Sequence, residues 1–223
     1  PRPLLLYKDG REQALQTHIL QHPNASSLQN QPASILAEID QWAADNNRCM
    51  MTIGPERSAP IVDLIRTTKP QTMTELGGYI GYSAIKFGEE VRRAGGTRYC
   101  SLEYNPEYAA IARSLVEFAG LGDFVTILVG DARDSLAQLA GKATLDLLFL
   151  DHSGRLYLQD LLTVERLGLL VRGAHVVADN VWLPGAEPYA EFMGQSEQVV
   201  DGRVLRYETR TLPYVLSNGQ QVS

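Results

Sequence analysis

The chain is short of cysteine, of basic residues and of long apolar runs, and each shortage excludes a class of protein. Its two cysteines, Cys49 and Cys100, cannot build a disulfide scaffold or a cysteine-based zinc site, and such sparse use suits a reducing compartment. No segment approaches the roughly 18 apolar residues of a membrane-spanning helix. Lys and Arg number 20 against 26 Asp and Glu, so the net charge is −6, which argues against a general nucleic-acid binder.

The same features predict location and partners. The three leucines at residues 4–6 form too short an apolar run for a signal peptide. We therefore expect a cytoplasmic protein, and the alternative is an organellar presequence that has already been cleaved. We expect no nucleic-acid or membrane partner, and either a monomer or a weak homodimer.

What the chain does have is enough apolar residues for one sizeable core. Its 223 residues, 44% of them hydrophobic, fit a single domain without repeats. Residues 1–68 are predicted to form a helical lid region, with helices over 11–21, 35–46 and 59–67. Ser34 is the expected N-cap of the second helix, and Pro60 falls near the first turn of the third.

Residues 69–223 alternate strand and helix. The predicted strands are 72–76, 97–103, 124–128, 145–150, 174–178 and 204–211, and a last strand follows a turn at Asn218–Gly219. The predicted helices are 83–94, 106–119, 134–139, 157–167 and 188–193. This alternation predicts a doubly wound, Rossmann-like α/β sheet with helices on both faces, whose ligand lies beyond the carboxyl ends of the strands.

The first strand runs into a glycine turn, Glu75-Leu-Gly-Gly-Tyr-Ile-Gly81. Position 79 is Tyr where the dinucleotide fingerprint needs Gly, so a pyrophosphate is not expected. An acid followed by glycines suits a cationic cofactor with an amino-acid tail, namely S-adenosylmethionine (SAM). Ser83, at the start of the next helix, can meet that cofactor's carboxylate. The alternative is an ordinary glycine-rich turn.

The second strand ends at Glu103, 22 residues after Gly81. An acid at this position can accept hydrogen bonds from two ribose hydroxyls. A glutamate at a strand end is common by itself. Together with the glycine turn, it predicts a nucleoside-type ligand.

Oxygen-bearing side chains follow the fourth and fifth strands. Asp151 comes directly after one, and Asp179 and Asn180 follow the other. Two carboxylates and an amide oxygen form a ligand set suited to Mg²⁺ or another divalent cation such as Mn²⁺. The alternative is that these side chains cap the turns and helices that follow.

These motifs, in this order, resemble the catechol O-methyltransferase family, which is SAM- and Mg²⁺-dependent. The resemblance covers residues from about 10 to 212. It depends on residues 51–54 (MTIG), 75–83 (ELGGYIGYS), 103–111 (EYNPEYAAI), 118–121 (FAGL), 149–152 (FLDH), 178–181 (ADNV) and 184–185 (PG).

The resemblance implies a site, residue by residue. The implied metal ligands are Asp151, Asp179 and Asn180. The implied SAM contacts are Ile53, Glu75, Gly77, Ser83, Glu103, Tyr104, Ala132, Asp151 and His152. The implied substrate is a small aromatic diol, whose two oxygens the metal would bind.

The acceptor side departs from the family pattern. The family's general-base lysine falls at Gly154, and the adjacent Arg155 can only stabilise a phenolate electrostatically. The family's late-strand glutamate falls at Leu212, or at Glu208 in another register. The tryptophans at the substrate mouth fall at Cys49 and Ser153.

Three hypotheses follow for function. The first is an O-methyltransferase for a bulkier or more acidic polyphenol, which needs little help from a base. The second is a methyltransferase for another nucleophile, with Arg155 binding an acidic substrate group. The third is a SAM- or metal-binding protein with little catalysis. In each methyltransferase case we expect Cys49, Trp182 and Pro184 to line the acceptor pocket.

Overall fold

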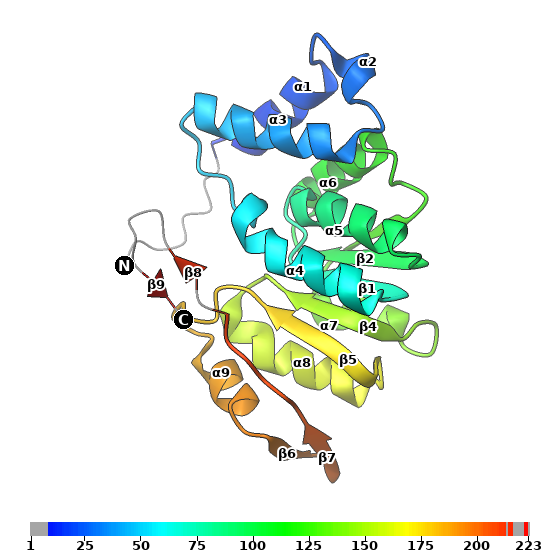
Figure 1. The fold of residues 1–223 in the computed structure, drawn as a ribbon, viewed down its shortest axis with the longest axis vertical. Coiled ribbons are helices and arrows are strands. Elements are labelled where there is room, and N and C mark those ends of the chain that lie inside the picture. Colours follow the sequence, from blue (N-terminus) through cyan, green and yellow to red (C-terminus); the bar gives the residue numbers. More distant parts are fainter. Residues whose placement is uncertain (1–8, 213, 216–220, 223) are drawn as a thin grey trace.

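The computed structural model describes residues 9–212, 214–215 and 221–222. Its central element is a parallel five-stranded sheet with the order β3-β2-β1-β4-β5 (Figure 1). The strands are β1 (Thr72–Leu76), β2 (Arg98–Glu103), β3 (Val125–Val129), β4 (Leu145–Leu150) and β5 (Leu170–Ala178). The strand order reverses between β1 and β4, which is where a doubly wound sheet places its ligand.

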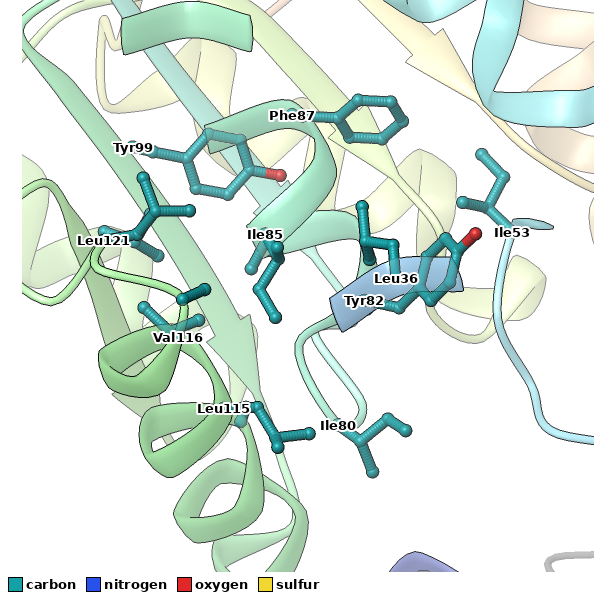
Figure 2. Close-up of a cluster of buried hydrophobic side chains, with 14 of the residues drawn as sticks. Leu36, Ile53, Ile80, Tyr82, Ile85, Phe87, Tyr99, Leu115, Val116 and Leu121 are labelled. Carbon is teal, nitrogen blue, oxygen red and sulfur yellow. The ribbon is translucent and has the colours of Figure 1, made fainter. Parts of the chain in front are cut away.

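Helices cover both faces of the sheet, as the sequence predicted. They are α1 (Arg11–Leu20), α2 (Ala25–Leu28), α3 (Pro32–Asp45), α4 (Gly54–Thr68), α5 (Tyr82–Arg93), α6 (Pro106–Phe118), α7 (Ala132–Leu139), α8 (Tyr157–Arg166) and α9 (Glu187–Met193), with a 3-10 turn η1 (Gly154–Leu156) before α8. One apolar core joins α1 and α3–α6 to one face of the sheet, and a second joins α7–α9 to the other. Figure 2 shows part of the first core, including Ile85 and Phe87 of α5 and Leu115 and Val116 of α6.

Local sequence signals explain where several elements begin. The Asn105 side chain accepts a hydrogen bond from the Glu107 backbone N–H, so it caps α6 as predicted, and Pro106 occupies the first turn. Strand β4 is almost wholly apolar because helices bury it on both sides.

Some predicted helix starts were wrong. Helix α3 begins at Pro32, so Ser34 lies in its first turn and is not the N-cap. Helix α4 begins at Gly54 with Pro55 in its first turn, so Pro60 lies inside the helix. In both cases a proline nearer the true start supplies the fixed φ that favours a first helical turn.

The predicted strand over 204–211 was also too long. Strand β7 (Arg203–Arg206) pairs antiparallel with β6 (Glu197–Val200) in a separate two-stranded sheet. Asp201 and Gly202 both have positive φ, which is the geometry of a tight hairpin turn and a signal that the prediction overlooked. Strand β8 (Tyr214–Val215) pairs with β9 (Gln221–Val222), and the predicted turn at Asn218–Gly219 lies outside the described residues.

The N-terminal helices pack beside the sheet. The Tyr82 hydroxyl of α5 donates to Asp40 of α3 at 2.8 Å. Two parts of this region contact the carboxyl end of the sheet: Arg57 at the start of α4 donates to Asp179, and Glu12 of α1 accepts from the Tyr79 hydroxyl of the β1–α5 turn. The lid role of residues 1–68 stays a prediction. None of the helices described is long and apolar enough to cross a membrane.

Candidate active site

The residues singled out at strand ends meet along one edge of the sheet. In the parallel register Leu76 pairs with Leu102 on one side and with Leu150 on the other, and Leu150 pairs with Ala178. The residues that follow these strand ends therefore lie side by side. The Asp151 and Asp179 backbone N–H groups continue the ladder, donating to the Leu76 and Leu150 carbonyls, each at 2.9 Å.

The glycine turn fits this edge only because it has no side chains. Gly77 has a φ of +102°, and a Cβ there would lie 2.5 Å from the Asp151 carbonyl oxygen. A Cβ on Gly78 would lie 2.2 Å from the Ser101 Oγ. The two glycines therefore let the β1–α5 turn lie directly against the end of β4 and against Ser101 of β2.

Glu75 is a fully buried carboxyl group with spare hydrogen-bonding capacity. The Tyr99 hydroxyl donates to its Oε2 at 2.7 Å, whereas Oε1 has no partner among the described residues. Burial raises the pKa of Glu75 to about 7, against the opposing effect of neighbouring hydroxyl groups. A cationic ligand beside Glu75 would relieve this cost, which fits the amino group or sulfonium of SAM.

Glu103 is held in a fixed orientation by backbone donors. Its Oε2 accepts from the Tyr79 N–H and its Oε1 from the Asn105 N–H, both at 2.7 Å. Burial raises the pKa of Glu103, and those N–H groups oppose the shift. Each oxygen keeps a further lone pair, which is the arrangement needed to accept from two vicinal hydroxyl groups.

The predicted metal ligands combine two crowded carboxyl groups. Burial, and next the nearby Asp179 charge, raise the pKa of Asp151 well above its usual value, and burial raises that of Asp179. Asn180 follows in the left-handed region with a φ of 56°. Two partly buried carboxyl groups and an amide oxygen supply the oxygen ligands that a hard divalent ion prefers, so these residues fit such an ion.

His152 is fixed by a second buried acid. Its Nε2 lies 2.8 Å from Asp160 Oδ2, and its Nδ1 is buried without a hydrogen-bond partner among the described residues. The Tyr157 hydroxyl of the same α8 turn donates to the Asp179 carbonyl at 2.9 Å. Helix α8 thus orients both strand ends, and an unpartnered ring nitrogen is left for a ligand.

The other predicted contacts are more open. Arg155 lies across the turn at Gly185, where a Cβ would be 2.5 Å from the Arg155 Cγ. Among the predicted acceptor residues, Cys49 is exposed and Trp182 is 48% exposed. Exposed Tyr104 directly follows Glu103, and Ala132 begins α7.

Of three further predicted positions, one is buried and two lie outside the strands. The Ile53 side chain is buried in the core, so only its backbone is available to a ligand. Glu208 and Leu212, the two registers for the family's late-strand glutamate, are exposed in the irregular segment after β7. Neither therefore lies on a strand of the parallel sheet.

Sequence reasoning missed Arg57, Tyr99 and Asp160. Arg57 Nη1 donates to Asp179 Oδ2 at 2.5 Å. A signal for Arg57 was available, because arginine in the first turn of a helix opposes the helix dipole and so suggests another reason for its position. Tyr99 and Asp160 gave no such signal, because their contacts with Glu75 and His152 arise only when the elements pack.

Comparisons with known proteins agree with this architecture. A family model described as O-methyltransferase matches residues 25–204. The catechol O-methyltransferase of Bos taurus is 40% identical over 193 residues, which cover 85% of this chain and 68% of that protein. A probable O-methyltransferase of Mycobacterium tuberculosis is 32% identical over 222 residues, which cover 94% of this chain and 92% of that protein.

A solved structure supports the fold independently. The O-methyltransferase from Bacillus cereus, in complex with SAH, superposes with a TM-score of 0.62 at 22% identity. The match covers 92% of this chain and 93% of that chain. The sheet and the helices on both its faces are therefore those of this group of methyltransferases.

Proposed function

The chain belongs to the catechol O-methyltransferase-like family of O-methyltransferases, and from this premise we propose that it transfers a methyl group from SAM to a hydroxyl of a catechol-type or polyphenolic small molecule, with the help of a divalent metal. The observation that carries the proposal is the register of β2, β1, β4 and β5. It aligns the buried acids Glu75 and Glu103 with the metal-ligand set Asp151, Asp179 and Asn180 along one edge.

The cofactor half of the proposed site uses buried, oriented groups. The Glu75 Oε1 and the His152 Nδ1 have no partner among the described residues, and the turn at Gly77 is closed to side chains. SAM supplies the electrophilic methyl group on its sulfonium. Glu75 balances the cofactor's positive charge, Glu103 accepts from its ribose hydroxyls, and His152, held by Asp160, contacts its adenosine part.

The metal half uses Asp151, Asp179 and Asn180. A bound Mg²⁺ or Mn²⁺ supplies a Lewis acid that lowers the pKa of an acceptor hydroxyl. The carboxylates of Asp151 and Asp179 would offset most of the charge of such a dication. The Tyr157 hydroxyl fixes the Asp179 backbone and so orients that half of the site.

The acceptor is expected to be an aromatic diol whose hydroxyl ionises easily. Two exposed apolar side chains are close in sequence to residues of the site. Met51 precedes Thr52, whose carbonyl accepts a hydrogen bond from Arg57, and Trp182 follows Asn180 by two residues. They offer a surface for an aromatic ring. Gly154 cannot act as a base, so deprotonation depends on the metal and on the acceptor's own acidity.

Product detection tests this function. The protein is incubated with SAM and a panel of catechols and flavonols, with Mg²⁺ or with EDTA. We expect mono-O-methylated diols only with metal, at rates that rise steeply as the acceptor pKa falls. Metal-independent methylation of other nucleophiles would contradict the proposal, as would SAM binding without any product.

Arg155 is the proposed electrostatic contributor at the acceptor mouth. Arg155→Gln is expected to raise the KM for a carboxylated catechol several-fold while leaving the KM for a neutral catechol nearly unchanged. Equal effects on both acceptors would remove Arg155 from this role.

A further inference from the structure

Arg57 stands where its charge is unfavourable for its own helix. It occupies the first turn of α4, whose amino end carries the positive pole of the helix dipole. An exposed arginine in this position would cost stability. Its side chain is instead folded back toward the strand ends and is only 27% exposed.

The guanidinium joins two separate parts of the site. Its Nη1 donates to Asp179 Oδ2 at 2.5 Å, at the end of β5. Its Nη2 donates to the Thr52 carbonyl at 2.9 Å and its Nε to the Ile53 carbonyl at 3.1 Å. One rigid fork therefore ties the segment before α4 to a predicted metal ligand.

The hydrogen bonds of Asp179 make this contact important. Its Oδ1 accepts from the Asn180 backbone N–H at 2.9 Å, and its Oδ2 accepts from Arg57. Each carboxylate oxygen therefore has one donor and keeps a further lone pair, so a cation that binds Asp179 shares it with the guanidinium, whose positive charge opposes that of the cation. The charge of Arg57 also lowers the pKa of Asp151 and Asp179, against the effect of burial.

We propose that Arg57 is a built-in counter-ion that competes with the divalent metal for Asp179, and that its two carbonyl bonds couple this competition to the position of Thr52 and Ile53. The inference depends on the proposed function for the presence of a metal at Asp179. In the metal-free protein the guanidinium neutralises the acid pair and keeps the site formed. Metal binding weakens one of its three bonds, while the other two hold it nearby.

Calorimetric titration of SAH-loaded protein with Mn²⁺ separates the effect of the Arg57 charge from that of its hydrogen-bond geometry. Arg57→Gln removes the competing charge and is expected to tighten Mn²⁺ binding about tenfold, the effect of one nearby charge in a partly exposed site. Arg57→Lys keeps the charge and is expected to stay within about twofold of wild type. Arg66→Gln is the matched control, because it removes a charge at the other end of the same helix, where Arg66 pairs with Glu90.

The outcomes distinguish this inference from the proposed function. If the wild-type protein binds no Mn²⁺, the metal-dependent function is wrong. If wild type binds Mn²⁺ and Arg57→Gln leaves the affinity unchanged or weaker, only the competition is wrong. Circular dichroism of each variant confirms that the fold is intact before titration.

A second titration tests the coupling to residues 52–53. With EDTA present, SAH binding is expected to weaken several-fold in both Arg57→Gln and Arg57→Lys, because neither side chain reproduces the three-bonded fork. The Arg66→Gln control is expected to bind SAH as wild type does. Unchanged SAH affinity in both Arg57 variants would contradict the coupling.

Discussion

The two halves of the proposed site are built differently. The cofactor half has at its centre side chains at the ends of β1, β2 and β4 that are buried or partly buried and held by hydrogen bonds, as Glu103 is by two backbone N–H donors. The acceptor half consists of loop residues such as Arg155 and the half-exposed Trp182. On the proposed function, the half that is held by hydrogen bonds would fix the methyl donor, whereas the open half would determine the acceptor.

The largest expected effect is on the methylation rate, from a change in Asp179, the predicted metal ligand between the cofactor half and the acceptor half. Asp179→Asn should lower Mg²⁺-dependent methylation about 1,000-fold, because metal stabilisation of a developing charge is worth several kcal/mol. SAH affinity should change much less, which calorimetry checks alongside the rate. Asp123→Asn, at an exposed position outside the site, is the control. Equal loss of SAH binding and of rate would mean that the two halves are not separable.

The next largest effect on the rate should come from restoring a base to the acceptor half. Gly154→Lys should raise the rate with a weakly acidic catechol by up to about 100-fold, the lower range of general-base catalysis. Gly154 has no positive φ, and a Cβ there would lie 3.1 Å from the Ala186 Cβ, so a small shift accommodates the side chain. Gly154→Met controls for side-chain length. If methionine accelerates the reaction as much as lysine does, proton transfer is not the cause.

The folding stability should depend on pH through Glu75, which lies in the cofactor half. Glu75 has a folded-state pKa of about 7 against an ordinary value of 4.5, so between these values the folded state holds a proton that the unfolded state has released. Its contribution is fully present below pH 4.5 and is lost as the pH rises toward about 7. The free energy of unfolding of the ligand-free protein, measured with denaturant, should therefore fall by on the order of 3 kcal/mol across that window because of this group.

Glu75→Gln should remove that part of the pH dependence. The raised pKa values of Glu103, Asp151 and Asp179 act in the same direction, so the test is the difference between the wild-type and variant slopes. Identical slopes would show that Glu75 is ionised at little cost in the folded protein.

The smallest expected effect concerns ribose recognition. Glu103→Gln should weaken SAH binding about tenfold, because the amide loses the charge and leaves one backbone N–H without its carboxylate acceptor. Glu107→Gln, on the exposed first turn of α6, is the control. An unchanged SAH affinity would place the ribose elsewhere.

Much of the fold could be predicted from sequence because its signals are local. Strands β1 and β4 were predicted at their observed bounds, and the Asn105-Pro106 start of α6 was correct. The β6–β7 hairpin was missed because its turn signal was overlooked, and nothing local shows that it pairs apart from the parallel sheet. Helix boundaries failed where the first proline, rather than a preferred capping residue, marked the start.

The candidate site was predictable to the same extent. Residues that directly follow strands, such as Asp151 and Asp179, could be named because parallel strands end at one edge. The partner of His152 could not, because Asp160 reaches this edge only through tertiary packing, and the unusual place of Arg57 in its helix did not show that it contacts Asp179. The acceptor loops have no regular hydrophobic pattern, so the sequence indicated only that they depart from the family pattern.

The proposed function requires that Asp151, Asp179 and Asn180 together bind a dication beside the cofactor. An anomalous difference map from crystals grown with SAH and Mn²⁺ would show whether they do. We expect one strong peak contacted by both carboxylates and the Asn180 amide oxygen. Bound SAH with no such peak between these three side chains would contradict it.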